Sequence, residues 1–209
     1  MTGTFTDIAL APDSMQGNSD LGDIFTRCGP IHIEIGSGKG TFLLNFARSN
    51  PHLNVLGIEW ANKYYQYSVD RMLRWGIDNV RIVRTEAASF IRECVGGSTI
   101  SVFHVYFPDP WPKKKHHKRR FINQENIEII HRCLVNHGEL RLATDHVGYF
   151  EWMSDLFRLE PGNRALFEKI YFQTEVPVGE GERVGSNFER KYLKEGRLIH
   201  TLALTKTPV

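Results

Sequence analysis

The chain has 209 residues, with 26 Lys and Arg against 24 Asp and Glu, and only three Cys. A chain of this length usually forms one large domain and buries enough surface to fold without disulfides or a structural metal. No uncharged apolar run approaches the roughly 20 residues of a membrane-spanning helix. The first twenty residues contain no Lys or Arg, which argues against a secretory signal. We therefore expect a cytoplasmic protein; its distant cysteines have no zinc-ligand spacing.

The net charge of +2 conceals an uneven distribution. Residues 113–120 read Lys-Lys-Lys-His-His-Lys-Arg-Arg and hold six of the 26 cations without an acid. Acids therefore exceed bases by four in the remainder of the chain. A dense basic segment on a mildly acidic body indicates a polyanion partner. The alternative is a solvated loop with incidental lysines.

The hydrophobic pattern alternates between strands and helices along most of the chain. Residues 1–25 are rich in Ser, Thr, Gly and Asp and predict a flexible arm with a short ordered piece near Leu21–Phe25. Beyond the arm, residues 26–209 show no linker and predict one domain. The expected strands are 31–35, 55–59, 80–83, 100–107, 138–143, 167–174 and 197–205. The expected helices are 40–49, 62–75, 87–94, 123–134, 146–159 and 187–194.

Strictly alternating strands and helices are typical of a doubly wound, mostly parallel sheet. The last strand follows a long polar segment, so we expect it to form an antiparallel edge of a seven-stranded sheet. This α/β pattern is similar to that of Rossmann-like methyltransferases. In such sheets ligands bind beyond the carboxyl ends of the strands, so the residues after each strand are the candidate site.

A glycine-rich segment, Glu34-Ile-Gly-Ser-Gly-Lys-Gly-Thr41, follows the first strand. It lacks the first glycine and the Ser/Thr after the lysine that a Walker phosphate loop requires. It also lacks the third glycine of the dinucleotide fingerprint, where Thr41 stands. Glu-x-Gly-x-Gly-x-Gly instead resembles the first motif of S-adenosylmethionine (SAM) methyltransferases, with Glu34, Gly36 and Gly38 as candidate cofactor contacts. A purely structural turn is the alternative.

Two further acids end the next strands. Glu59 follows the second strand, where a carboxylate can accept hydrogen bonds from both hydroxyls of a ribose. Glu86 follows the third strand, where this fold recognises an adenine edge. Either acid alone could be a solvent-facing strand end, but three acid-bearing strand ends beside a glycine loop favour a nucleoside cofactor.

The fourth strand runs into Phe107-Pro-Asp-Pro-Trp-Pro-Lys113. Prolines fix the backbone on both sides of Asp109, so its carboxylate is held in place. The Asp-Pro-aromatic order is similar to the Asp/Asn-Pro-Pro-aromatic motif of enzymes that methylate base nitrogens.

The segments Pro108-Asp-Pro-Trp-x-Lys113, His117-Lys-Arg-Arg120 and Ala143-Thr-Asp145 together closely resemble the bacterial tRNA (guanine-N7-)-methyltransferase family. The resemblance covers roughly residues 31–205. It implies a Rossmann-like, SAM-dependent enzyme that methylates N7 of guanine 46 in the variable loop of tRNA, that is, a tRNA (guanine(46)-N(7))-methyltransferase.

The resemblance also implies roles for individual residues. Glu34, Glu59, Glu86 and Asp109 match SAM-contacting positions, and Asp109 also matches the catalytic residue. Lys113 and Asp145 match substrate contacts. The family's Thr-x-aromatic-Glu substrate motif corresponds to Ser186-Asn187-Phe188-Glu189, in which serine replaces the threonine. The RNA-interacting stretch corresponds to Lys115, His116, His117, Lys118, Arg119 and Arg120.

Two other classes of protein stay open on the residues alone. A SAM enzyme acting on a protein or a small molecule would use the same glycine loop but has no need of the basic segment. A noncatalytic RNA-binding protein would need the cations but not Asp109 between prolines. We expect tRNA as the partner, no metal, no membrane, and a monomer or homodimer.

Overall fold

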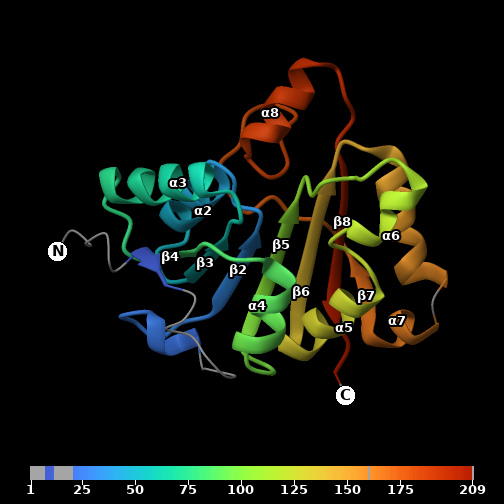
Figure 1. The fold of residues 1–209 in the computed structure, drawn as a ribbon, viewed down its shortest axis with the longest axis horizontal. Helices are drawn as coiled ribbons and strands as arrows, with labels where there is room; N and C mark the ends of the chain where they lie inside the picture. Colours follow the sequence, from blue (N-terminus) through green and yellow to red (C-terminus); the bar gives the residue numbers. More distant parts are fainter. Residues whose placement is uncertain (1–7, 12–20, 160, 209) are drawn as a thin grey trace.

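The computed structural model describes residues 8–11, 21–159 and 161–208. The strands form one eight-stranded sheet in the order β1-β4-β3-β2-β5-β6-β8-β7 (Figure 1). The strands are β1 (Ala9–Leu10), β2 (Ile31–Ile35), β3 (Asn54–Ile58), β4 (Val80–Val83), β5 (Ile100–Tyr106), β6 (Leu134–Thr144), β7 (Phe167–Ile170) and β8 (His200–Lys206).

Helices cover both faces of this sheet (Figure 1). They are α2 (Thr41–Ser49), α3 (Asn62–Arg74), α4 (Ala87–Cys94), α5 (Gln124–Cys133), α6 (Val147–Leu159), α7 (Pro161–Leu166) and α8 (Asn187–Lys194). Two 3-10 helices, η2 (Leu21–Ile24) and η3 (Lys114–Arg119), complete the described elements. No helix of the described ranges combines the length and the apolar character needed to cross a lipid bilayer.

Alternation along β2 assigns its residues to the two faces. Ile31, Ile33 and Ile35 pack in the cluster that also contains residues of α4, α5 and α6. His32 points the other way and lies 5.1 Å, centroid to centroid, from the ring of Phe46 in α2. All five residues of β2 are buried because helices cover both sides of a parallel strand.

The antiparallel last strand is confirmed, but it does not lie at the edge. β8 pairs antiparallel with β6 on one side and with β7 on the other, so β7 is the edge strand. After β6 the chain first forms β7 at the edge of the sheet, and β8 then inserts between β6 and β7. The order of strands in a sheet is set by tertiary pairing, and periodicity in the sequence does not report it.

Within residues 1–25, the short ordered piece expected near Leu21–Phe25 is confirmed as η2, whereas β1 lies in a stretch that was expected to be flexible. β1 pairs parallel with β4 and adds the eighth strand. Leu21 and Phe25 are buried in the core, and Ile8 is buried on the other face. Ile8 and its neighbours lack a helical or strand period, so only their packing shows that this stretch is ordered. The rest of the predicted arm, 1–7 and 12–20, lies outside the described residues.

Candidate active site

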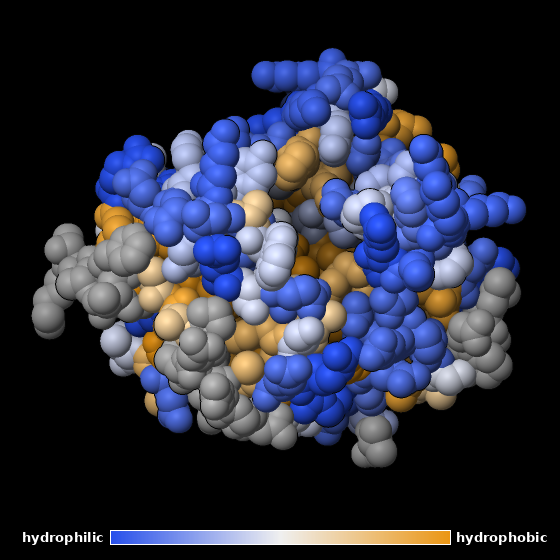
Figure 2. All heavy atoms as spheres, in the orientation of Figure 1, coloured by the Kyte–Doolittle hydropathy of each residue, from blue (hydrophilic) through white to orange (hydrophobic). Residues whose placement is uncertain are grey.

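The carboxyl ends of the central strands surround two adjoining cavities of about 710 and 610 Å³. Gly36 lines both, so the glycine loop separates them. The first cavity lies between this loop and α8, which stands above the ends of β2 and β5 (Figure 1). Figure 2 shows a hollow beneath α8 with apolar residues inside and hydrophilic ones around it.

The glycine loop has the backbone freedom that a close ligand requires. Gly36 has a φ of 76°, and a side chain there would meet no atom within 4 Å, so its surface is open to a ligand. Gly40 is glycine for another reason: a Cβ there would lie 2.9 Å from Ser68 Oγ, so this residue lets the loop pack on α3.

Glu59 ties this loop to β3. Its Oε2 accepts a hydrogen bond from the Gly38 amide at 2.7 Å, and its Oε1 accepts one from the Ala61 amide at 2.7 Å. The same carboxylate lines the second cavity. Each carboxylate oxygen can accept a second hydrogen bond. Glu59 therefore shapes the loop and still presents acceptors to the cavity, as binding a ribose requires.

Glu34 is a buried acid that faces the first cavity. No donor among the described residues lies within hydrogen-bonding distance of its Oε2. Burial, and then repulsion from Glu59, raise the pKa of Glu34 to about 8. A buried carboxyl oxygen without a hydrogen-bond partner is costly and fits a ligand that supplies a cation or an N–H donor at this position.

Glu86 begins α4. Its Oε1 accepts from the Ala88 amide at 3.0 Å and its Oε2 from the Ser89 amide at 2.8 Å. Partial burial alone would raise its pKa, but these hydrogen bonds lower it on balance. Glu86 is thus a helix cap that also lines the second cavity.

The loop after β5 holds Asp109 in a strained frame. Phe107 and Trp111, on either side of Asp109, have φ values of 54° and 43°. Residues other than glycine rarely adopt this left-handed region. The Phe107 amide donates to the Ala143 carbonyl at 2.7 Å, which fixes the start of the loop to β6. Asp109 is exposed and lines the second cavity with Glu59 and Glu86.

Arg120 fixes the other end of this loop, and its RNA contact stays a prediction. The side chain is only 3% exposed, and its Nε donates to the Pro110 carbonyl at 2.9 Å. Its guanidinium lies 4.8 Å from the ring centroid of Tyr149 and 5.2 Å from that of Trp152. Arg120 also lines the second cavity, so it supports the Asp109 loop from inside the site.

The rest of the basic segment is on the surface. It forms η3, where the sequence predicted a loop. Lys118 and Arg119 line the second cavity beside Asp109, and Arg119 lies over the ring of Trp111 at 5.0 Å. His116 and His117 contact Trp111 and Trp152 edge-on or tilted, each at 5.8 Å. Lys113 and Lys115 are exposed.

The Ser186–Glu189 motif divides into a cavity wall and a buried support. Ser186 caps α8 by accepting from the Glu189 amide at 3.1 Å, so serine keeps the hydroxyl that capping needs. Ser186, Asn187 and Phe188 line the first cavity.

Glu189 is held by the loop before α8, and its substrate contact stays a prediction. Its carboxylate is fully buried and accepts from the amides of Arg183, Val184 and Gly185 at 2.6–3.3 Å. The carboxylate thus shapes the loop that leads into α8.

Asp145 and Lys113 line neither cavity. Asp145 Oδ2 accepts from Arg197 at 2.6 Å, and this Arg197 guanidinium lies 4.6 Å from the ring centroid of Tyr192 in α8. The pair joins the end of β6 to α8. A substrate contact of Asp145, as predicted, would therefore compete with its ion pair to Arg197.

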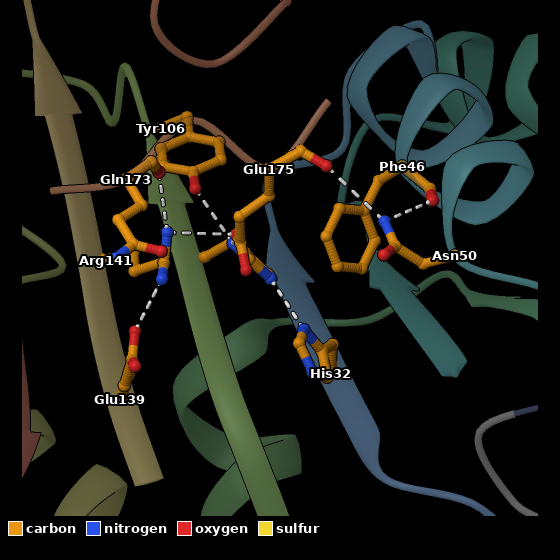
Figure 3. Close-up of polar contacts among 9 residues, drawn as sticks. His32, Phe46, Asn50, Tyr106, Glu139, Arg141, Gln173 and Glu175 are labelled. Carbon is orange, nitrogen blue, oxygen red and sulfur yellow. Dashed lines mark hydrogen bonds and ion pairs between the residues drawn. The ribbon is translucent and has the colours of Figure 1, made fainter. Parts of the chain in front are cut away.

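A buried polar network under the first cavity was missed by the sequence reasoning (Figure 3). Both ring nitrogens of His104 form hydrogen bonds. Nε2 lies 3.1 Å from His32 Nδ1, and Nδ1 lies 2.8 Å from the Tyr106 hydroxyl oxygen. Arg141 lies 3.2 Å from Glu175 and donates to the Gln173 carbonyl at 2.8 Å. Polar residues inside otherwise apolar strands were the available signal.

This network anchors the segment before α8 to the middle of the sheet. Burial lowers the pKa of His32 to about 3 and that of His104 well below its ordinary value, so both rings are neutral at pH 7. Burial, partly offset by Arg141, raises the pKa of Glu175 to about 7. Tyr106 carries the network to the cavity wall. Within the described ranges, no three His, Cys, Asp or Glu side chains gather as metal ligands would.

Solved structures share this fold. A putative methyltransferase from Streptococcus mutans in complex with SAH is 12% identical, with a TM-score of 0.54 and 92% of each chain covered. A 30S ribosomal A1408 methyltransferase from an uncultured bacterium is 14% identical, with a TM-score of 0.56, and the match covers 92% of this chain and 98% of that one. The fold is that of Rossmann-like methyltransferases.

Sequence comparison identifies the group within that class. The family model described as a putative methyltransferase matches residues 28–202. A tRNA (guanine-N(7)-)-methyltransferase of Streptococcus thermophilus is 31% identical over 92% of this chain and 87% of its own length. One from Halorhodospira halophila is 32% identical over 92% and 82%, respectively. The chain belongs to the tRNA (guanine-N(7)-)-methyltransferase family.

Proposed function

We propose that this protein is a cytoplasmic enzyme that transfers the methyl group of SAM to N7 of guanine 46 in the variable loop of tRNA. The observation that carries the proposal is the position of Asp109. A strained loop places Asp109 at a cavity whose lining includes the acids Glu59 and Glu86 and the cations Lys118 and Arg119. Membership of the family supports the reaction and the substrate.

The residues present fit SAM. The open surface at Gly36 allows close approach of a ligand, and Glu59 and Glu86 offer acceptors for ribose and adenine in the second cavity. The unpartnered Oε2 of Glu34, which lines the first cavity, offers an acceptor for an ammonium group. Because Gly36 lines both cavities, a ligand lying over it can contact Glu34 in the first cavity and Glu59 and Glu86 in the second.

When bound, SAM supplies an electrophilic methyl group on a sulfonium. Guanine N7 carries a free in-plane lone pair, so the protein need not remove a proton before transfer. The purine gains positive charge as the methyl arrives, and the fixed carboxylate of Asp109 stabilises that charge. Orientation by the rigid loop provides the remaining acceleration. Lys118 and Arg119 hold the RNA backbone without reading its sequence.

The test is a methylation assay with position mapping. Purified protein is incubated with an unmodified tRNA transcript and SAM labelled on the methyl group, and the modified nucleotide is mapped by digestion and mass spectrometry. We expect one 7-methylguanosine, at position 46, and none in a matched transcript with adenine there. Saturable SAM binding without methylation of any tRNA would contradict the proposed substrate. Absence of SAM binding by calorimetry would contradict the enzyme class.

A further inference from the structure

Helix α3 and the residue that caps its end carry three exposed aromatic side chains, the first of which lines the first cavity. Tyr64, Tyr67 and Trp75 are 39%, 46% and 54% exposed, which is unusual for rings of this size. At about 100° per residue they fall within one narrow sector of the helix surface. We call these three residues the α3 stripe. Tyr64 lines the first cavity, so the stripe begins at its mouth and runs outward along α3.

Helix α3 is tied to the glycine loop, and one ring of the stripe is held by a cation. Arg71 lies in the same sector, and its guanidinium donates to Thr41 Oγ1 at 2.7 Å and to the Lys39 carbonyl at 3.3 Å. At the far end, the Arg48 guanidinium lies 4.7 Å from the Trp75 ring centroid and orients that ring. Preorganised rings lose little entropy when a ligand stacks on them.

The charge around this surface is positive. Lys39, Lys191 and Lys194 are exposed and line the mouth of the first cavity, with Lys191 and Lys194 on α8. Nearby acids form ion pairs: Asp70 with Arg74 at 2.7 Å and Glu182 with Arg190 at 2.9 Å. Glu195 pairs with Arg197 at 2.7 Å and lies 3.9 Å from Lys191, so Lys39 and Lys194 contribute most of the positive charge. A cationic rim beside exposed rings is the combination that binds single-stranded nucleic acid, because phosphates meet the cations and bases stack on the rings.

We propose that the α3 stripe and the lysines of the cavity mouth bind unpaired nucleotides that flank the target guanine. This inference rests on the proposed function and adds a second RNA surface, separate from the basic segment in η3. The stripe with its lysines adjoins the first cavity and the basic segment adjoins the second, so the two surfaces lie on either side of the glycine loop. An RNA strand that contacts both is held on each side of the base to be methylated.

The test compares Tyr67→Ala/Trp75→Ala with wild type, because these two residues line neither cavity. We expect the KM for tRNA to rise at least tenfold, kcat to change less than twofold, and the Kd of SAM to stay constant. The ring-preserving variant Tyr67→Phe/Trp75→Phe should keep most of the tRNA affinity. Tyr171→Ala is the matched control, since Tyr171 is 77% exposed and follows β7 at the far edge of the sheet. It should leave every parameter unchanged.

A direct readout does not depend on turnover. A tRNA transcript with 4-thiouridine in the variable loop, irradiated in complex with the protein, should crosslink to the peptide that contains Tyr64 and Tyr67. Wild-type tRNA affinity in the double alanine variant, together with no such crosslink, would overturn the inference. So would sedimentation showing a wild-type dimer that this variant disrupts, because the stripe would then be an interface between copies. If wild type methylates tRNA and the double alanine variant has the same KM and kcat, the role of the stripe is excluded but the proposed function stands.

Discussion

Arg120 donates a hydrogen bond from its Nε to the carbonyl of Pro110, at 2.9 Å, one residue beyond Asp109. The last cation of the basic segment is therefore part of the frame that holds the acid of the site. Burial between Tyr149 and Trp152 fixes its guanidinium. The segment 113–120 thus combines a support for the active loop with a surface of exposed cations.

Replacing Asp109 by alanine should remove most of the methyl transfer. Loss of one well-placed electrostatic partner costs about 3 kcal/mol in the barrier, or roughly a hundredfold in rate. Because Asp109 is exposed on a loop, folding and tRNA affinity should stay near wild type. Single-turnover rates with saturating tRNA and SAM measure the effect. Near-normal turnover in Asp109→Ala would show that another residue supports the transfer.

Replacing Arg120 by lysine should lower kcat while leaving the salt dependence of tRNA binding unchanged. Lysine keeps the charge but loses the planar group between the two rings and the Nε that bonds Pro110. The melting temperature should fall by a few degrees, for a loss of about 1–2 kcal/mol. A salt slope that changes in Arg120→Lys would mean that this side chain does reach the RNA.

Neutralising Lys118 and Arg119 together should have the opposite pattern. Both are exposed at the second cavity, so the KM for tRNA should rise and kcat at saturation should change little. Each lost phosphate contact should reduce the log–log salt slope by about 0.7–0.9. Filter binding from low to moderate salt measures this slope. An unaltered slope would return these residues to the role of a solvated surface.

Glu59→Ala should weaken SAM binding roughly tenfold or more, because two charge-assisted hydrogen bonds to a ribose are lost at about 1.5–3 kcal/mol each before water compensates. The variant also loses the bonds to the Gly38 and Ala61 amides, so the glycine loop should become more mobile. Calorimetry gives the dissociation constant, and hydrogen exchange at Gly38 separates the two effects. Increased exchange with unchanged SAM affinity would assign Glu59 to the loop alone.

Glu34 should make stability fall as pH rises. Its pKa of about 8 in the folded protein lies above its ordinary value of 4.5, so its stabilising contribution is complete below about pH 4.5 and is lost as pH rises through about 8. Glu175 acts in the same direction, with a pKa of about 7. Urea unfolding of wild type and Glu34→Gln from pH 5 to 9 isolates Glu34, because Glu175 is common to both. A pH-independent difference between the two proteins would contradict the raised pKa.

Several elements were predictable from local sequence. The strand Ile31–Ile35, the helix Ala87–Cys94 and the helix Asn187–Lys194 have the expected bounds. Each has a local signal: an apolar run ended by glycine, or a capping side chain, Glu86 or Ser186, followed by helical periodicity. The placement of Glu59, Glu86 and Asp109 around one cavity also followed from the sequence, since strand ends of a parallel sheet meet at one edge.

Burial and pairing were decided only in three dimensions. The sequence determined which residues are charged and which end a strand, because both are local properties. It did not distinguish Arg120, whose guanidinium lies against two rings, from its exposed neighbour Arg119. Nor did it show that the Glu189 carboxylate accepts hydrogen bonds from three backbone amides. The insertion of β8 between β6 and β7 and the network of His32, His104 and Arg141 have the same origin. Such features depend on contacts between segments far apart in the chain, and those contacts exist only once the sheet and its helices have packed.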